Sequence, residues 1–182
     1  MEKDLAFGII SILLILISWR AIFSAGSHGF YRFFAWESIA WLLVNNFIYW
    51  FDNPFSLIHL FSWLFLIISA YFAIAGVILM KRIGKPAEIR SEGELYKFEK
   101  TTVLVDTGIF KYIRHPLYSS LILLAWGILL KNITVPLLVV SLISTVCLFL
   151  TALSDEKECI EFFGDSYRDY MKRSKRFIPF LI

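Results

Sequence analysis

Two pairs of charged side chains at the borders of apolar segments are the first candidates for chemistry in this chain. Arg114 and His115 stand directly before Pro116, a residue that suits the first turn of a helix. The unpaired N–H groups at that helix N-terminus, together with Arg114, would stabilise an anionic group. Asp155 and Glu156 follow a later apolar segment and could bind a cation. The two pairs predict a dipolar site for an amino-acid zwitterion, although Arg114 as a membrane anchor and His115 as a plain helix cap would explain the first pair alone.

The composition indicates that these residues are positioned by membrane helices. Hydrophobic residues make up 58% of the 182 residues and charged residues only 18%, whereas a soluble domain carries about 25% charge. About 20 helical residues cross a hydrocarbon layer. We therefore expect an all-α, polytopic membrane protein of about five transmembrane helices. The predicted spans are Leu5–Phe23, Ala35–Phe51, Leu57–Met80, Leu117–Leu130 and Ile133–Leu153.

The first and the fourth predicted spans need an interpretation of their own. The first resembles a signal peptide, but no small-residue cleavage site follows it, and Trp19 and Arg20 favour a retained helix. The fourth is short for a lone span. We interpret it as one arm of a helical hairpin with the fifth, which turns at Lys131-Asn132 and re-enters near Pro136.

The basic residues are concentrated in two polar segments. Fourteen of the eighteen Lys and Arg lie in residues 81–116 or in the tail from Ser154. One hairpin separates these segments, so they share a side, which the positive-inside rule predicts to be cytoplasmic. The N-terminus is then outside, in the cell membrane if the protein is prokaryotic. A net charge of +3 without a basic face predicts no nucleic-acid partner.

We expect a single domain over residues 1–182. It comprises three spans in 1–80, a cytoplasmic loop in 81–116, the hairpin in 117–153, and an amphipathic helix with a tail in 154–182. The helix is predicted because apolar and aromatic residues recur at three- and four-residue steps. This stripe contains Glu156, Ile160, Phe163, Tyr167, Tyr170 and Met171.

A longer pattern surrounds the first charged pair. Residues 101–118, TTVLVDTGIFKYIRHPLY, resemble the signature of the isoprenylcysteine carboxyl methyltransferase and phospholipid methyltransferase superfamily. That signature has a Leu-Val step, a Gly followed by an aromatic residue, and Arg-His-Pro-x-Tyr. The acidic pair and the residues that follow it resemble the superfamily's C-terminal pattern; these are Phe163-Gly164, Tyr167, Tyr170 and Arg176-Phe177-Ile178-Pro179. The resemblance covers about residues 95–179.

The resemblance implies an integral membrane methyltransferase that uses S-adenosyl-L-methionine. The acceptor would be lipophilic, such as a phospholipid amine, an isoprenoid, a prenylcysteine-like carboxylate or another lipid. The implied adenosine contacts are Thr102, Val103, Leu104 and Val105, with Phe110 packed on the cofactor. The implied contacts to the methionine part are Arg114, His115, Pro116, Leu117 and Tyr118, with Asp155 or Glu156 on its ammonium. Phe110 and Tyr118 would also be explained by simple helix packing.

The sequence departs from the superfamily pattern at three places. Phe110 stands where a Tyr is usual, and Glu156 is followed by Lys157 rather than by further acids. The isoprenylcysteine enzymes carry an Arg before the acidic block that is thought to meet the substrate carboxylate. The corresponding segment here, residues 150–154, has no basic residue. This argues against prenylcysteine as the acceptor, but not against methyl transfer.

Other residues are candidates for the acceptor site. Glu37, Trp41 and Asn45 share one face of the second span at four-residue steps, so they could line a substrate site or form interhelical hydrogen bonds. Arg176 could close the site or anchor the tail at lipid headgroups. Cys147 and Cys159 are too few for a disulfide framework and are best explained by packing. The sequence contains no Cys/His cluster, so we predict no metal site.

Methyl transfer from a sulfonium is an in-line displacement, so the protein's main task would be alignment of the reactants and exclusion of water. An ammonium acceptor would first have to lose a proton, but the sequence assigns no general base. Two other functions compete with this hypothesis. One is a nicotinamide-dependent lipid reductase on a related fold, and the other is a non-catalytic membrane protein.

Overall fold

The computed structural model describes residues 2–87, 96 and 98–179. The regular secondary-structure elements of these residues are all helices. The α-helices are α1 (Glu2–Ile22), α2 (His28–Asn46), α3 (Leu57–Ile83), α4 (Pro116–Leu129), α5 (Val135–Phe163) and α6 (Asp165–Arg173), and the short 3-10 helices are η1 (Phe47–Tyr49) and η2 (Gly108–Lys111). Within the described ranges, the only strand-like pairing is one isolated bridge between Ile113 and Lys175. The predicted all-α fold class is confirmed.

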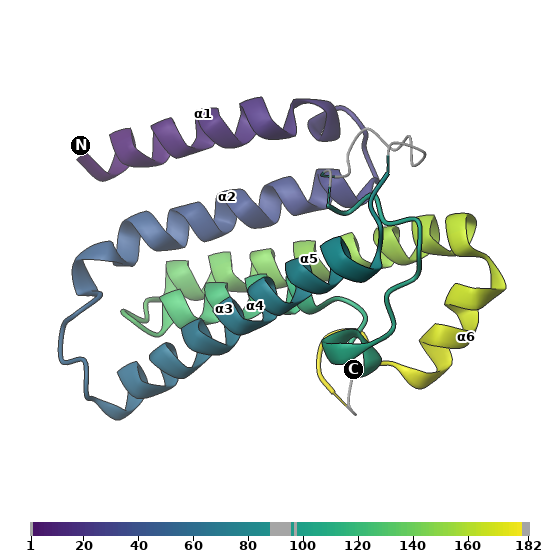
Figure 1. Ribbon diagram of the computed structural model, residues 1–182. Helices are drawn as coiled ribbons and strands as arrows, with labels where there is room; N and C mark the ends of the chain where they lie inside the picture. Colours follow the sequence, from purple (N-terminus) through teal and green to yellow (C-terminus); the bar gives the residue numbers. More distant parts are fainter. Residues whose placement is uncertain (1, 88–95, 97, 180–182) are drawn as a thin grey trace.

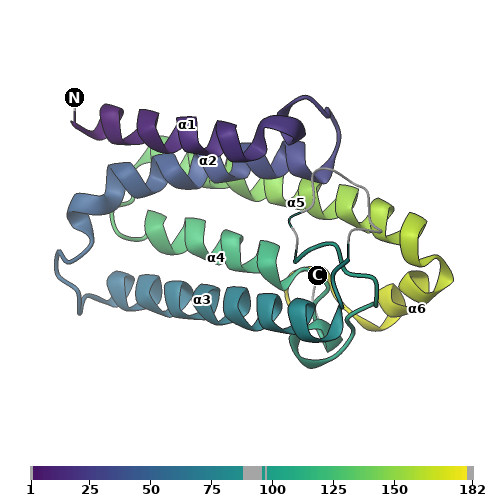
Figure 2. The ribbon, with the colours of Figure 1, turned by 45° about the horizontal axis from the view of Figure 1, so that its top comes forward.

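Helices α1 to α5 run side by side, and α6 folds back at one end of this bundle (Figure 1). The N-terminus, the α2–α3 connection and the α4–α5 turn lie together at the other end (Figure 2). The α1–α2 loop, the segment between α3 and α4, and α6 therefore share one end, as the two basic segments were expected to do. Which side of a membrane this end faces stays a prediction. Residues 88–95 and 97, with Arg90 and Lys97 of the basic loop, lie outside the described residues.

Three of the five predicted spans form helices that are long and apolar enough to cross a membrane, namely α1, α3 and α5. Helix α4 is apolar but has only 14 residues. Helix α2 begins at His28, seven residues before the predicted start, because the Ser27 hydroxyl accepts a hydrogen bond from Phe30 N at 3.1 Å and caps it there. The charged residue Arg32 is therefore part of this helix. The count of five spans stays a prediction.

Small residues bring α3 and α4 close together. The Ser62 hydroxyl donates to Gly127 O at 2.6 Å, and the Ser69 hydroxyl donates to Ser120 O at 2.7 Å. One further heptad along α3, a Cβ on Gly76 would lie 3.0 Å from Leu117. Such serine and glycine contacts are typical of helices packed within a bilayer. They fix the start of α4, and with it the Arg114-His115-Pro116 motif, against α3.

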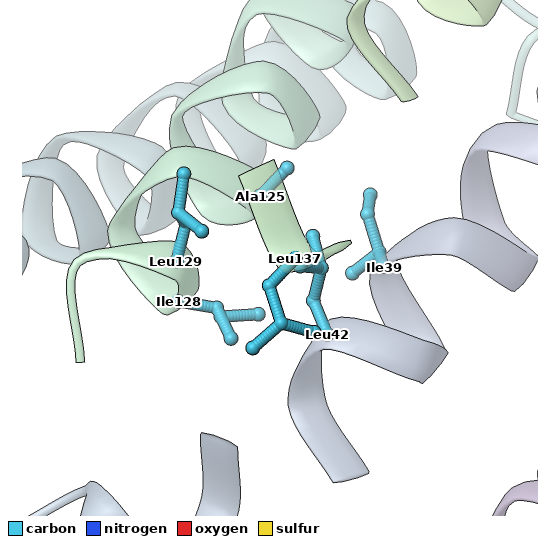
Figure 3. Close-up of a cluster of buried hydrophobic side chains, with 6 residues drawn as sticks. All are labelled: Ile39, Leu42, Ala125, Ile128, Leu129 and Leu137. Atoms are coloured by element: carbon cyan, nitrogen blue, oxygen red, sulfur yellow. The ribbon is translucent and has the colours of Figure 1, made fainter. Parts of the chain in front are cut away.

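The bundle has a buried apolar centre, whose side chains Figure 3 shows. Ile39 and Leu42 of α2 pack there with Leu137 of α5 and with residues of α4. The α4 members are Ala125, Ile128 and Leu129. This cluster joins three helices whose opposite ends carry the charged side chains.

The C-terminal part differs from the single amphipathic helix expected from Ser154. Helix α5 continues unbroken to Phe163, and the chain then turns at Gly164, whose φ of 60° is in the region that favours glycine. Helix α6 starts after this turn and ends at Arg173. Ser174 is extended, and Lys175 N donates to Tyr112 O at 2.9 Å. The predicted helix is therefore wrong in its extent, and the tail instead pairs with the segment before His115.

Candidate functional site

A pocket lies between the end of α3, the segment before α4, and helices α5 and α6. Nine of the predicted cofactor residues line it: Leu104, Val105, Phe110, Arg114, His115, Pro116, Leu117, Tyr118 and Asp155. Thr102, Val103 and Glu156 do not belong to the lining. Side chains that were not predicted as site residues also line it: Met80, Glu99, Thr101, Cys159, Phe163, Tyr167 and Tyr170.

The apolar wall of the pocket is held by the end of α3. Thr102 N and Val103 N both donate to Gly84 O, at 2.8 and 3.1 Å. A Cβ on Gly84 would stand 2.4 Å from the Thr101 Cγ2 atom, so the two segments approach each other more closely than any other residue would allow. The Thr102 hydroxyl also donates to Lys85 O at 2.8 Å, so Thr102 and Val103 act as an anchor beside Thr101, Leu104 and Val105, which line the pocket.

The Arg114-His115-Pro116 motif is held by the C-terminal segment. Arg114 N donates to Lys175 O at 2.7 Å, and His115 N donates to Arg176 O at 3.2 Å. His115 occupies the N-cap position of α4, with Pro116 next to it, as predicted. Its side chain makes no cap hydrogen bond to the helix. The imidazole is therefore directed to other partners.

Glu156 is the centre of an ion cluster beside the pocket. Arg114 places Nε and Nη2 at 3.0 Å from Glu156 Oε1. Arg176 donates from Nε to Oε1 at 3.0 Å and from Nη2 to Oε2 at 2.7 Å. Glu156 is only 4% exposed. Two guanidinium groups share one carboxylate, so this cluster has a surplus of positive charge, and Arg114 presents it to the pocket.

Asp155 belongs to the pocket itself. The Tyr118 hydroxyl donates to Asp155 Oδ2 at 3.2 Å, and the Cys159 thiol lies 3.6 Å from Oδ1. The His115 ring is placed between the two acids, with Nδ1 3.4 Å from Asp155 and Nε2 3.3 Å from Glu156. Burial lowers the pKa of His115, but hydrogen bonds and charge from the two carboxylates outweigh it and leave this pKa raised.

Glu99 is a pocket carboxylate that sequence reasoning missed. Arg32 Nη1 donates to Glu99 Oε1 at 2.8 Å and to Oε2 at 2.9 Å. Tyr96 N donates to Oε2 at 2.9 Å, and the Arg32 guanidinium lies 4.5 Å from the centre of the Tyr96 ring. Glu99 belongs to no recognised motif. The available signal was its place two residues before Thr101, within the residues 95–179 that the resemblance covers.

Two of the three predicted substrate residues of α2, Glu37 and Trp41, contact α1. Glu37 Oε2 accepts from the Ser11 hydroxyl at 2.7 Å, and the Trp41 and Phe7 rings meet edge to face at 4.9 Å. Asn45 donates to Trp41 O within its own helix at 2.9 Å. These residues do not line the pocket. Glu37 thus makes an interhelical hydrogen bond, and a role for this group in substrate binding stays a prediction.

A second hollow has a wholly different lining. It has a volume of about 490 Å³ and lies between α3, α4, α5 and the C-terminal segment. Its walls are almost entirely apolar and include Phe72, Ile122, Phe149 and Phe177. The Phe177 ring lies 6.3 Å from the His115 ring and 6.1 Å from the Phe149 ring, measured between centroids. Phe177 therefore separates this apolar groove from the charged site.

The donor set of the pocket suits a polar organic ligand. Two carboxylates, a guanidinium and an imidazole meet apolar and aromatic walls. In the part of the chain that the structure describes, no three His, Cys, Asp or Glu side chains are grouped as metal ligands would be. The pocket volume is about 80 Å³, below the roughly 300 Å³ of typical small-molecule sites. Binding of a nucleoside would require the lining side chains to move apart.

Comparisons with known proteins find one family model and several relatives that match part of the chain. Residues 86–166 match the family model described as phospholipid methyltransferase. Methanethiol S-methyltransferase of Pseudomonas deceptionensis is 33% identical over 73 residues, which are 40% of this chain and 27% of that protein. Protein-S-isoprenylcysteine O-methyltransferase of Schizosaccharomyces pombe is 36% identical over 87 residues, 47% of this chain and 36% of that protein.

A second methanethiol S-methyltransferase also matches part of the chain. Methanethiol S-methyltransferase 1 of Bradyrhizobium diazoefficiens is 31% identical over 71 residues, 39% of this chain and 24% of that protein. The matches thus span about a quarter to a third of the length of these curated relatives. No solved structure matches the chain.

Proposed function

We propose that the protein is a membrane methyltransferase, because residues 86–166 match the phospholipid methyltransferase family model, as the motifs predicted. It uses S-adenosyl-L-methionine to methylate a lipophilic acceptor. The observation that carries the proposal is the convergence of eight motif residues on one pocket with Asp155. These residues come from segments that lie almost 40 positions apart in the chain.

The charges around the pocket support binding of the donor's amino-acid part. The positive Arg114–Arg176–Glu156 cluster and the N-terminus of α4 suit its carboxylate. Asp155 suits its ammonium, because this acid lines the pocket. Glu156 lies outside the lining and is already paired with the guanidinium groups of Arg114 and Arg176. Of the two acids left open by the sequence, we therefore assign the ammonium to Asp155 and an organising role to Glu156.

The other end of the pocket supports binding of the nucleoside. Leu104, Val105 and Phe110 offer an apolar surface of the kind on which a base packs. Tyr170 holds this wall, because its hydroxyl donates to Phe110 O at 2.6 Å. The bound donor would supply an electrophilic methyl group. The chain's own contribution is to bind and orient both reactants and to exclude water.

His115 is better suited to orientation than to proton transfer. Both of its ring nitrogens face carboxylates, one in Asp155 and one in Glu156. Its ring also stacks on Tyr118 at 5.3 Å. We propose that His115 fixes the two acids relative to each other. A thiolate or carboxylate acceptor would need no further base.

The apolar groove supports an acceptor with a hydrocarbon chain. The relatives differ here, because the names of two specify methanethiol and that of another a prenylated cysteine. A methyl-sized thiol has no use for an apolar hollow of about 490 Å³, whereas a lipid tail gains roughly 0.8 kcal/mol for each CH₂ removed from water. Phe177 lies between this groove and His115. We assign the acceptor headgroup to the same border, where Arg176 contacts Glu156.

Two measurements test this function. Calorimetry with S-adenosylhomocysteine and the purified protein in detergent should show saturable binding. Incubation with methyl-labelled S-adenosylmethionine and a total lipid extract should then label a lipid species, which mass spectrometry would identify. A protein that binds neither nucleoside would contradict the proposal. Labelling of methanethiol alone, and of no lipid, would retain methyl transfer and overturn the lipid acceptor.

A further inference from the structure

Glu99 lines the part of the pocket formed by the segment that leads into the motif. It lies two residues before Thr101 and five before Leu104, and all three side chains line the pocket. Asp155 and His115 reach the same pocket from α5 and from the start of α4. The pocket therefore has carboxylates from two different segments. The segment that carries Glu99 is the one assigned to the nucleoside.

The charge of Glu99 is already compensated inside the protein. Arg32 is 6% exposed and Glu99 is 9% exposed, and the guanidinium contacts both carboxylate oxygens. Arg32 comes from the first turns of α2, 67 positions away in the sequence. A buried pair of this kind adds no net charge to the pocket. Glu99 is thus a poor partner for a ligand cation, in contrast to Asp155.

The carboxylate nevertheless keeps capacity to accept hydrogen bonds. An ionised carboxylate has about four lone-pair directions. Oε1 accepts from Arg32, and Oε2 accepts from Arg32 and from Tyr96 N. Because Arg32 compensates the charge of Glu99, and Glu99 lines the pocket, this carboxylate suits a neutral ligand group that donates an O–H hydrogen bond. In nucleoside sites generally, an acidic side chain on a ribose hydroxyl meets this need.

We propose that Glu99 binds the ribose of the donor nucleoside by accepting a hydrogen bond from one of its hydroxyl groups, and that Arg32 positions it. The inference rests on the proposed function, because it requires a nucleoside donor. It makes α2 part of the donor site, although no α2 side chain lines the pocket. It also gives the protein a means to distinguish a ribonucleoside donor from a deoxyribonucleoside.

The test compares ligands before it compares variants. Calorimetry on the full chain in detergent would measure S-adenosylhomocysteine and its 2′-deoxy and 3′-deoxy analogues. We expect the wild-type protein to bind at least one deoxy analogue about tenfold more weakly, since a hydrogen bond to a charged group is worth that much or more. This comparison requires no substitution and so cannot be confounded by misfolding.

Variants then assign the discrimination to Glu99. The double variant Arg32→Gln with Glu99→Gln removes both charges together, so that no lone charge is left buried. We expect it to bind S-adenosylhomocysteine and the deoxy analogues with nearly equal, weakened affinity. Arg32→Lys keeps the charge but not the planar guanidinium, and should reduce the ratio of affinities in part. That ratio is a readout which a merely structural role of Arg32 would leave unchanged.

Glu158→Gln is the matched control. Glu158 also has a buried basic partner, His28 Nδ1 at 2.7 Å, but it does not line the pocket. This variant should keep the wild-type ratio. Equal binding of all three ligands by the wild-type protein, or a wild-type ratio in the folded double variant, would overturn the proposal. No binding of any nucleoside is a different outcome, which would contradict the proposed function itself.

Discussion

Arg176 contacts both carboxylate oxygens of Glu156, with Nε 3.0 Å from Oε1 and Nη2 2.7 Å from Oε2. The same carboxylate accepts a hydrogen bond from Arg114, which lies 42 positions earlier in the chain. One acid thus ties the C-terminal segment and the start of α4 to the end of α5. Its first role is to hold these three segments together, and loss of activity in a Glu156 variant would not by itself identify a ligand contact.

This arrangement predicts that Glu156→Gln is strongly destabilising. The substitution leaves two guanidinium groups close together without their counter-charge, of which Arg114 is buried. Removing one partner of a buried ion pair costs about 3 kcal/mol or more. We expect a marked fall in the melting temperature in detergent, measured by thermal unfolding. Glu161→Gln, at an exposed position of the same helix, should change it little, and an equal effect of both substitutions would contradict the prediction.

Asp155→Asn should separate ligand binding from folding. Asp155 lines the pocket and accepts a hydrogen bond from the Tyr118 hydroxyl. The amide oxygen of an Asn at this position can accept the same hydrogen bond. If its charge meets the donor's ammonium, the affinity for S-adenosylhomocysteine should fall by about tenfold or more. The melting temperature should fall less than in Glu156→Gln. Asp169→Asn on the exposed face of α6 is the control, and undiminished binding by Asp155→Asn would refute the assignment.

The stability of the protein should depend on pH through His115, which lies just before α4 and outside the membrane-spanning helices. Burial lowers the pKa of His115, but its contacts with Asp155 and Glu156 raise it above its ordinary value of 6.5. A raised pKa in the folded state means that protonation stabilises the fold. This contribution is complete below pH 6.5 and is lost as the pH rises through the raised pKa.

Thermal unfolding over a pH series would measure this contribution. The melting temperature of the wild-type protein should fall above pH 6.5 by more than that of His115→Asn, which has no titrating ring. The two curves should therefore converge at alkaline pH. Parallel curves over the whole series would show that His115 does not titrate as its surroundings indicate.

Local signals made part of this architecture predictable. The Pro116 position fixed the start of α4, and Thr134 with Pro136 marked the start of α5, where the Thr134 side chain caps Leu137 N. Such signals act within one helical turn, so the sequence alone displays them. The helix break at Gly164 could have been predicted from the glycine itself, since a φ of 60° favours this residue. The periodic apolar stripe across it concealed the break.

The pairing of distant charges was not predictable in this way. Arg32 lies on α2 and Glu99 in the segment between α3 and α4, so their meeting depends on tertiary packing. Asp155 and Glu156 are neighbours in sequence, but successive residues of a helix point about 100° apart. Asp155 therefore reaches the pocket, and Glu156 reaches the two arginines. Only the helix rotation distinguishes them, and this is set by tertiary packing.

The close contact at Gly84 gives a final prediction. A Cβ there would meet Thr101 Cγ2 at 2.4 Å and Met80 O at 2.5 Å, so Gly84→Ala must displace the segment anchored by Gly84 O. Overpacking of this kind costs about 1–3 kcal/mol. Because the displaced segment carries Leu104 and Val105, donor affinity should fall together with the melting temperature. Gly8→Ala in α1, where a Cβ would have no atom within 4 Å, is the matched control and should preserve both quantities. A Gly84→Ala protein with unchanged affinity would show that the nucleoside does not depend on this wall.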